Sequence, residues 1–409
     1  MPAESSRLIA HLDMDAFYAS VELLRYPELV GLPVVIGGGS RHRPSESIDP
    51  ATGKAARQFT RLRDYAGRGV ATTATYSARA LGVNSAMGLM KAARLAPDAI
   101  LLPTDFDAYR RCSRAFKAAV RAIAPLVEDR GIDEIYMDLT GVKLPEHESA
   151  HDSIYDDPVE AWWRARDVAR AIKDAVRVAT GLSCSIAVAP NKLLAKIASE
   201  LDKPDGLTML AATDIAQRVW PLAARKINGI GPKTAERLDG LGVHTIGELA
   251  RAEPAWLLEH FGASRGAWMH DAANGRDDRP IVTESEPVSI SRETTFDRDL
   301  HAVRDRDELS AIFTELCVEV AGDLQRKGYV GRTIGLKLRY DDFRIVTRDK
   351  TIDAATQDAR IIRRAAGECL KRVPLERRIR LLGVRVGSLS HAATGGAPVA
   401  QESSPLLFE

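Results

Sequence analysis

The chain has 409 residues, of which 45% are hydrophobic and 28% are charged. A single small fold is excluded, because this length predicts two to four domains at roughly 100 to 200 residues each. No run of about 20 apolar residues occurs, so the composition predicts a soluble globular protein without a membrane-spanning helix.

Basic and acidic residues nearly cancel, with 57 Lys and Arg against 56 Asp and Glu. This balance disfavours a surface that binds polyanions over the whole molecule. Between Arg292 and Arg385, however, 21 basic residues stand against 16 acidic ones, a net charge of +5 that leaves −4 for the remainder. The C-terminal third is therefore the basic part of the chain.

The four cysteines are scattered along the chain, at Cys112, Cys184, Cys317 and Cys369. Their spacing matches neither a zinc site nor a secreted disulfide framework. The N-terminal residues MPAESSRLIAHLD lack the basic and apolar regions of a signal peptide. We therefore expect a cytoplasmic protein with reduced thiols.

The first half of the chain predicts short strands and longer helices. Leu8–Leu12 and Pro33–Ile36 are apolar runs typical of strands. Residues 37–54, rich in Gly, Pro, Ser and charge, predict a mobile surface loop. Ala161–Thr180 predicts an amphipathic helix that stops at a glycine, followed by the strand CSIAVA and a helix over Lys192–Leu201 that KPDG breaks.

The second half predicts small Ala-rich helices up to about Asn274 and then a tether over Gly275–Ser291. Beyond the tether, helices and strands alternate, which predicts an α+β domain. These elements are a helix over Glu308–Lys327, strands over Arg332–Tyr340 and Phe343–Thr347, a helix over Thr356–Leu370 and a strand over Ile379–Val386. The last 20 residues predict a flexible tail.

Carboxylates lie at the ends of two predicted strands. Asp13 and Asp15 occur in HLDMD, and Asp133 and Glu134 occur in GIDEIYMD. Carboxylates are ligands for Mg²⁺, and two ions about 3.5 to 4 Å apart could clamp a phosphoryl displacement. Because neighbouring strand residues point to opposite faces, a shared site requires a bend, which Gly131 could help to form. Taken alone, the pattern favours the alternative of solvated or capping carboxylates.

Three further residues could contact phosphate groups. Tyr76 and Arg79 are three residues apart and share a face if the segment TYSAR begins a helix. Arg79 could bind phosphate oxygens through its guanidinium group, and Lys203 could supply a point charge after the preceding helix. Taken alone, the pattern favours the alternative of a surface arginine, a half-buried tyrosine and a lysine at a helix end.

The segment KINGIGPKTAERLDGLGV places Gly229 and Gly231 on either side of Ile230, before an amphipathic helix. A tight turn there exposes backbone N–H groups at a helix N-terminus, where anions bind. With Lys233 nearby, the segment resembles a helix-hairpin-helix element, which binds nucleic-acid phosphates without reading the sequence. The alternative is an ordinary turn bounded by glycines.

Together these motifs resemble the Y-family translesion DNA polymerases, and the bacterial DNA polymerase IV branch in particular. The resemblance extends from about Leu8 to Leu389 and is carried by five segments in order, HLDMDAFYASVE, ATTATYSARALGV, GIDEIYMD, AVAPNKLLAKIASELDKPDG and INGIGPKTAERL. It implies an α+β right-hand polymerase with a palm, small fingers, a helical thumb and a C-terminal α+β little finger.

The resemblance also implies domain boundaries. The palm would take residues 1–16 and 103–208, and the fingers would take 17–102 with an insertion at about 40–70. The thumb would take 209–274 with the helix-hairpin-helix, followed by a linker over 275–289, the little finger over 290–389 and the tail over 390–409. The basic little finger would grip a primer-template duplex through its phosphates.

By the same resemblance, Asp13, Asp133 and Glu134 correspond to the metal-binding carboxylates of the palm. Met14 would contribute its main-chain carbonyl to the second of two Mg²⁺ ions. Asp15 is not a metal ligand in the family, so we expect it to have a structural role.

The nucleotide contacts follow in the same way. Tyr18 corresponds to the steric gate, an aromatic ring that collides with a ribose 2′-hydroxyl, and Phe17 packs beside it. Tyr76, Arg79 and Lys203 correspond to contacts with the phosphates of the incoming deoxynucleotide.

Three features depart from the family pattern. The stretch from Gly39 to Ala71 is longer than usual and indicates an insertion in the fingers. Gly131 stands where the family commonly has Ser, and we expect a change in local backbone freedom without loss of activity. The tether TESEPVSIS is unusually acidic, which puts a DNA contact by the linker in doubt.

The tail QESSPLLFE is similar to a loose version of the bacterial sliding-clamp motif. Leucine and phenylalanine side chains would anchor such a peptide in a hydrophobic pocket. The clamp-binding residues would be Gln401, Leu406, Leu407 and Phe408. The spacing from Gln to Phe in the tail is longer than in the compact consensus. The open alternative is therefore a terminus that adheres to apolar surfaces without specificity.

The leading hypothesis is template-directed DNA polymerisation with low fidelity, in which a primer 3′-hydroxyl attacks the α-phosphate of a dNTP. The expected partners are primer-template DNA, dNTP and a sliding clamp, and the expected state is a monomer. One alternative is a noncatalytic polymerase-like accessory protein, which the three intact carboxylates disfavour. A nucleotide cyclase on a similar palm is the other, and it would leave the glycine turn and the basic third without a purpose.

Overall fold

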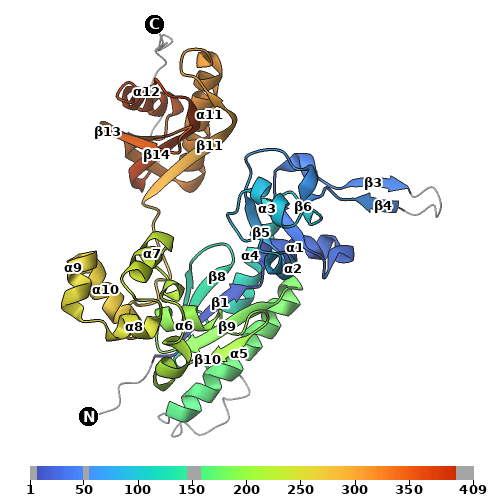
Figure 1. The fold of residues 1–409 in the computed structure, drawn as a ribbon, viewed down its shortest axis with the longest axis vertical. Helices are drawn as coiled ribbons and strands as arrows, with labels where there is room; N and C mark the ends of the chain where they lie inside the picture. The colour runs from blue at the N-terminus through green and yellow to red at the C-terminus, as the bar shows by residue number, and fades with distance from the viewer. Residues whose placement is uncertain (1–6, 49–54, 145–157, 393–409) are drawn as a thin grey trace. The chain divides into compact units, whose positions relative to one another are not determined.

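The computed structural model describes residues 7–48, 55–144 and 158–392, which form two compact units (Figure 1). The first unit extends to Glu284 and the second begins at Ser285. None of the helices in these residues has both the length and the apolar character that crossing a bilayer requires. Helices and strands are mixed in both units, which confirms the predicted α+β class.

A five-stranded sheet forms the centre of the first unit, in the order β10-β9-β1-β8-β7. The middle strand, β1, pairs antiparallel with β8 on one side and with β9 on the other. Because both faces of the sheet are covered, β1 is buried along nearly its whole length. The strands are β1 (Ile9–Met14), β7 (Val127–Asp129), β8 (Glu134–Asp138), β9 (Cys184–Ala189) and β10 (Leu207–Met209).

Helices pack on both faces of this sheet. On one face, α4 (Phe106–Arg121) and α5 (Pro158–Thr180) share a core with Ala10 and Leu12 of β1. On the other face lies α6 (Lys192–Ala198), the first part of the predicted helix over 192–201. The predictions for α5 and β9 are confirmed, because a regular apolar period and a glycine stop specify such elements locally.

A three-stranded sheet, β5-β2-β6, carries the next part of the first unit. Val34 and Ile36 of β2 pack into the core of the large sheet, whereas Val35 packs into a separate core. This division follows from the period of two in a strand, which sends adjacent side chains to opposite faces. The elements are α1 (Phe17–Arg25), β2 (Val34–Gly37), β5 (Ala71–Ala74), α2 (Tyr76–Ala80), α3 (Leu89–Leu95) and β6 (Ile100–Leu102).

The prediction of a mobile surface loop over residues 37–54 is wrong for Ser45–Ile48, which form a strand. Strands β3 (Ser45–Ile48) and β4 (Ala55–Gln58) pair antiparallel and form a hairpin that projects from the sheet β5-β2-β6 (Figure 1). Its base is anchored by Arg57, which donates to Glu28 at 3.0 Å, and by Phe59, which packs edge-on against Tyr26. The hairpin is held by backbone pairing and these contacts, so hydrophobic periodicity gave no signal.

Short helices complete the first unit, as predicted from the Ala-rich segments. Their apolar side chains, including Leu238, Ile246, Leu257 and Met269, form a core together with α6. The helices are α7 (Pro232–Gly240), α8 (Ile246–Arg251), α9 (Pro254–Phe261) and α10 (Ala263–Ala273).

Gly229 is required by the backbone before α7. Its φ is +114°, and a Cβ added there would lie 2.7 Å from the ring of Trp268. We expect Gly229→Ala to lower the free energy of unfolding by about 3 kcal/mol, through backbone strain and overpacking. Gly240→Ala is the matched control, because no atom of the described residues lies within 4 Å of its Cβ position. Thermal unfolding of both variants measures the effect, and equal melting temperatures would contradict the prediction.

The second unit is a four-stranded antiparallel sheet, β11-β14-β12-β13, with two helices on one face. Ile334, Leu336 and Leu338 of β12 point into the core beneath the helices, and the alternate residues point to the open face. The elements are β11 (Ser289–Leu300), α11 (Arg306–Lys327), β12 (Tyr329–Tyr340), β13 (Ile345–Thr356), α12 (Ala359–Leu370) and β14 (Ile379–His391).

Several expected boundaries in this unit need correction. The strand β11 was not predicted, and it begins at Ser289, so the last residue of the expected linker is already in the sheet. The strand expected over Phe343–Thr347 runs instead from Ile345 to Thr356, which delays α12 to Ala359. Polar strands such as β13 are held by pairing with β12, a partner that the local pattern does not reveal.

Candidate active site

Three carboxylates lie at one edge of the large sheet. Asp13, near the end of β1, is paired in register with Glu134, the first residue of β8. The Met14 amide donates to the Asp133 carbonyl at 3.0 Å. A bend over residues 131–133 precedes β8, so Asp133 and Glu134 are not consecutive residues of a regular strand. The segment of Asp13 and the segment of Asp133 and Glu134, about 120 residues apart in the sequence, therefore meet at this edge of the sheet.

The carboxylates differ in their electrostatic surroundings. Burial raises the pKa of Glu134, but the neighbouring His11 and the ion pair with Lys196 outweigh it and lower the pKa to about 2. Burial and the negative charges of Asp13 and Glu134 raise the pKa of Asp133. Within the described part of the chain Asp133 has no ion-pair partner. A bound cation would therefore stabilise the ionised form of Asp133 most.

Two lysines neutralise the other two carboxylates. Lys196 of α6 pairs with Glu134, and Lys203 donates to Asp13 at 2.6 Å and to Glu200 at 2.6 Å. Burial disfavours the charged form of Lys203, but the two carboxylates outweigh it and raise its pKa. Among the described residues, no three acidic, His or Cys side chains are already spaced as a metal cage. Oxygen ligands for a hard cation are nevertheless present at one place.

Gly131 lies beside this cluster, and a Cβ added there would be 3.8 Å from Oδ1 of Asp133 and from Cγ of Glu134. Both are ordinary contact distances, so we expect Gly131→Ser to shift the melting temperature by less than about 2 °C and to change the primer-extension rate by less than about twofold. Gly206→Ser is the contrasting variant, because its Cβ would lie 2.4 Å from the Asp202 carbonyl oxygen. Loss of extension in Gly131→Ser, in a protein that melts normally, would show that the backbone freedom of glycine is needed.

An aromatic cluster lies beside the carboxylates, at the start of α1. Phe17 is buried, whereas Tyr18 is half-buried and stacks on Tyr109 with ring centroids 4.2 Å apart. Phe106 packs edge-on against the same Tyr18 ring at 6.0 Å. Burial and the charge of Asp133 raise the pKa of Tyr18.

Tyr109 and Phe106 were missed by the sequence analysis. They are three residues apart on α4, a spacing that puts both rings on one face of a helix and could have indicated an aromatic platform. Their contact with Tyr18 joins segments about 90 residues apart, which no local pattern predicts.

Tyr76 and Arg79 share a face of α2, as their spacing predicts. The Arg79 guanidinium lies 5.0 Å from the centre of the Tyr76 ring and donates to the Ala74 carbonyl at 3.0 Å. The Tyr76 hydroxyl is buried and has no hydrogen-bond partner among the described residues. Burial and the charge of Asp15 raise the pKa of Tyr76 to about 12, and the charges of Lys203 and Arg79 oppose this shift.

The glycine turn is a separate feature of the first unit. Ile230 is buried between Gly229 and Gly231, and Gly231 immediately precedes α7. Arg265 donates to the Gly229 carbonyl at 2.8 Å, and Lys233 is exposed. The candidate clamp-binding residues, Gln401, Leu406, Leu407 and Phe408, lie outside the described residues.

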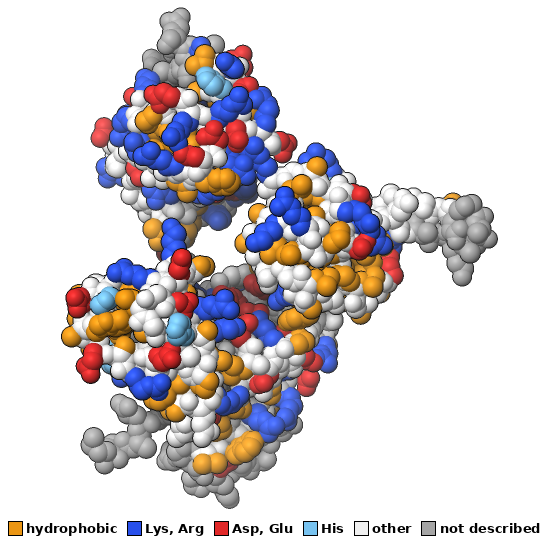
Figure 2. All heavy atoms as spheres, in the orientation of Figure 1, with side chains coloured by type: hydrophobic (Ala, Val, Ile, Leu, Met, Phe, Trp, Pro, Cys, Tyr) orange, Lys and Arg blue, Asp and Glu red, His pale blue; other side chains and the backbone are white. Residues whose placement is uncertain are grey.

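The open face of the second unit carries basic side chains with acidic partners. Arg385 pairs with Asp349 at 2.6 Å and Lys337 pairs with Glu293 at 2.7 Å. Gly335 makes room for the first pair, since a Cβ there would lie 2.4 Å from the Asp349 carboxylate. Figure 2 shows Lys and Arg side chains spread over the visible face of this unit, with Asp and Glu among them.

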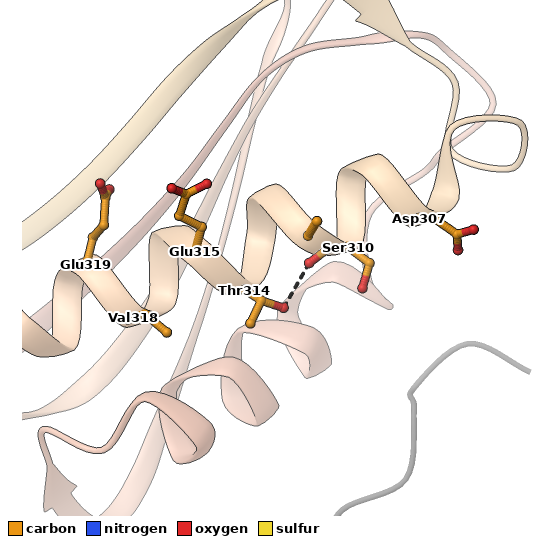
Figure 3. Close-up of a pocket in the computed structure, with 7 residues that line it drawn as sticks. Asp307, Ser310, Thr314, Glu315, Val318 and Glu319 are labelled. Carbon is orange, nitrogen blue, oxygen red and sulfur yellow. Dashed lines mark hydrogen bonds between the residues drawn. The ribbon is translucent and has the colours of Figure 1, made fainter.

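A shallow groove in the same unit has the opposite character (Figure 3). It lies along the exposed face of α11, where Asp307, Glu315 and Glu319 border it and the Thr314 hydroxyl donates to the Ser310 carbonyl at 2.8 Å. Its acidic lining does not suit a polyanion. The basic sheet face and the acidic helix face are therefore distinct surfaces.

Comparison with known proteins agrees with this geometry. Residues 12–200 match the model of the impB/mucB/samB family, and residues 287–399 match the model of the C-terminal domain of that family. The fold resembles that of the Y-family DNA polymerase chimera Dbh-Dpo4(243-245)-Dbh, with a TM-score of 0.74 and 23% identity, covering 93% of this chain and 98% of that one.

The sequence relatives are more specific. DNA polymerase IV of Alkalilimnicola ehrlichii is 38% identical over 94% of this chain and 96% of the relative. DNA polymerase IV of Caulobacter vibrioides is 36% identical over 95% of this chain and 85% of the relative. The chain is therefore a Y-family translesion DNA polymerase. Within that family it belongs to the DNA polymerase IV branch, whose activity depends on divalent metal ions.

Proposed function

We propose that the chain extends a primer on a DNA template through two Mg²⁺ ions held by Asp13, Asp133, Glu134 and the Met14 carbonyl. The observation that carries the proposal is the register of Asp13 opposite Glu134, with Asp133 in the adjoining bend. When bound, the ions supply charge neutralisation at the attacking and leaving oxygens of the phosphoryl transfer. The three carboxylates bind and orient them at the sheet edge.

The neighbouring side chains would select and hold the incoming deoxynucleotide. Tyr18, supported by Phe17 and Tyr109, presents a rigid ring that excludes a ribose 2′-hydroxyl. Tyr76, whose hydroxyl has no hydrogen-bond partner among the described residues, and Arg79 would donate to phosphate oxygens. Lys203 would exchange its contact with Asp13 for one with the triphosphate, which frees the carboxylate.

The domains follow the right-hand arrangement, with the palm over 1–16 and 103–208 and the fingers over 17–102. The thumb spans 209–274, and its Gly229, Gly231 and Lys233 bind a DNA phosphate. The linker covers 275–288, since Ser289 already belongs to β11, and the little finger, over 289–389, contacts the DNA backbone through its basic face. The tail over 390–409 recruits a sliding clamp to the monomer, and small fingers suit lesion bypass with low fidelity.

Primer extension with the purified chain tests this function, using matched, abasic and bulky-adduct templates with Mg²⁺ and dNTPs. We expect template-directed products on the matched template, extension past at least one lesion, and complete loss on metal chelation that added Mg²⁺ reverses. DNA binding without extension would support the noncatalytic alternative. A cyclic nucleotide formed without primer would support a cyclase.

A further inference from the structure

Asp15 is a buried carboxylate, only 2% exposed, that lies two residues beyond Asp13. Three donors reach it, the hydroxyls of Ser183 and Ser185 at 2.8 Å each and the backbone N–H of Asp205 at 2.8 Å. A carboxylate with three of its acceptor sites filled in this way is a structural anchor. Among the described residues it pairs with no cation.

The anchored segment is the turn over residues 202–206, which follows α6. Asp205 has a φ of +57°, a left-handed conformation that is uncommon outside glycine. Its side chain pairs with Lys173 at 2.7 Å and with Arg177 at 2.6 Å, both on α5. The left-handed backbone conformation is not one that Asp205 adopts freely, so the turn depends on its contacts. These contacts come from α5 on one side and from Asp15 on the other.

Lys203 projects from this turn toward the reaction site. Its side chain is 14% exposed, and its ammonium group lies 2.6 Å from the Asp13 carboxylate. The Tyr76 hydroxyl is buried and has no hydrogen-bond partner in the described part of the chain, and the charge of Lys203 opposes the rise in its pKa that burial causes. A small displacement of the turn would move the ammonium group away from these residues.

We propose that Asp15 is a positioning residue that fixes the 202–206 turn and thereby holds Lys203 where it meets the nucleotide triphosphate. The inference rests on the proposed function, and it gives the two acidic residues of the D-x-D motif different tasks. Asp13 faces Lys203 and the proposed metal site, whereas Asp15 faces the hydroxyls of Ser183 and Ser185 and the N–H of the turn.

The direction in which nucleotide affinity changes when Asp15 is replaced distinguishes a positioning role from a purely electrostatic one. Removing a negative charge near a triphosphate site should tighten nucleotide binding if Asp15 acts only through its charge. Loss of a positioning residue should weaken binding, because Lys203 is no longer held in place. If Asp15 were instead a metal ligand, its replacement would weaken metal binding.

The experiment measures the dissociation constant of a nonhydrolysable α,β-imido dNTP on the complex with primer-template DNA and Mg²⁺, which requires no turnover. We expect Asp15→Ala to weaken binding about tenfold, as the loss of a charge-assisted contact does. Asp15→Asn keeps the shape, and we expect a weakening of about threefold, because neutral hydrogen bonds are weaker than charge-assisted ones. Asp129→Asn, an exposed acid-to-amide change in the same sheet, should have no effect.

A double-mutant cycle with Lys203→Ala decides the mechanism. If Asp15 acts through Lys203, then Asp15→Ala and Asp15→Asn cause no further weakening once Lys203 is removed. Additive effects, tighter binding, or unchanged binding in Asp15→Asn would overturn the proposal. So would a loss of Mn²⁺ binding in Asp15→Ala equal to that in Asp13→Asn.

Asp15→Asn carries the test if Asp15→Ala does not fold, and the melting temperature identifies that case. Failure of the wild-type chain to extend a primer would refute the proposed function. The binding cycle would still decide whether Asp15 positions Lys203, so the two failures are distinguishable.

Discussion

Replacing Asp133 and Glu134 together by alanine is expected to lower kcat for dNTP incorporation by at least about 10³-fold, because metal-ion charge stabilisation of several kcal/mol is lost. The two residues lie with Asp13 at one sheet edge, and Asp133 has a raised pKa because its negative neighbours are close. Without them, only one of the three proposed carboxylate ligands remains. Single-nucleotide incorporation under rapid mixing measures the effect.

The fold should survive this change, because the two carboxylates lie at the end of a strand whose core residues are untouched. The matched control is Asp129→Ala, an exposed carboxylate on β7 of the same sheet, paired with Lys117 and Arg121 at 3.3 Å each. We expect wild-type incorporation in that control. Incorporation by Asp133→Ala with Glu134→Ala at the wild-type rate would remove the metal assignment.

Replacing Tyr18 by alanine is expected to reduce discrimination against ribonucleotides by about 100-fold, the equivalent of roughly 3 kcal/mol of steric overlap. The ring is held between Tyr109, stacked at 4.2 Å, and Phe106, edge-on at 6.0 Å, so it cannot move aside for a 2′-hydroxyl. The ratio of kcat/KM for a dNTP to that for the matching rNTP measures the effect.

Tyr18→Phe is the matched control, because it keeps the ring and removes only the hydroxyl. We expect it to discriminate as the wild type does. If Tyr18→Ala rejected ribonucleotides as strongly as the wild type, the steric gate would lie elsewhere, and the neighbouring Phe106 would be the next residue to test.

Local patterns predicted the elements that fold by their own periodicity. The helix α5 was predicted from its apolar period of about 3.6 residues, and the strand β9 was predicted from a short apolar run. Both signals depend only on consecutive residues. The hairpin β3–β4 and the strand β11 were missed, because polar strands are held by backbone pairing with partners elsewhere.

By itself the sequence determined the family, since five motifs in a fixed order identify it without any coordinates. It also located the carboxylates of the sheet edge, the aromatic residue Tyr18 and the glycine turn. Each of these is a residue type at a position, and residue types are visible along the chain.

Only the tertiary structure decided which residues meet. Lys203 reaches Asp13 and Asp15 reaches Ser183 across about 170 to 190 positions, and Tyr109 supports Tyr18 from another helix. These contacts depend on the packing of strands and helices that are distant along the chain. A carboxylate's partners, its burial and therefore its pKa arise from that packing, so two aspartates in one motif can have different tasks.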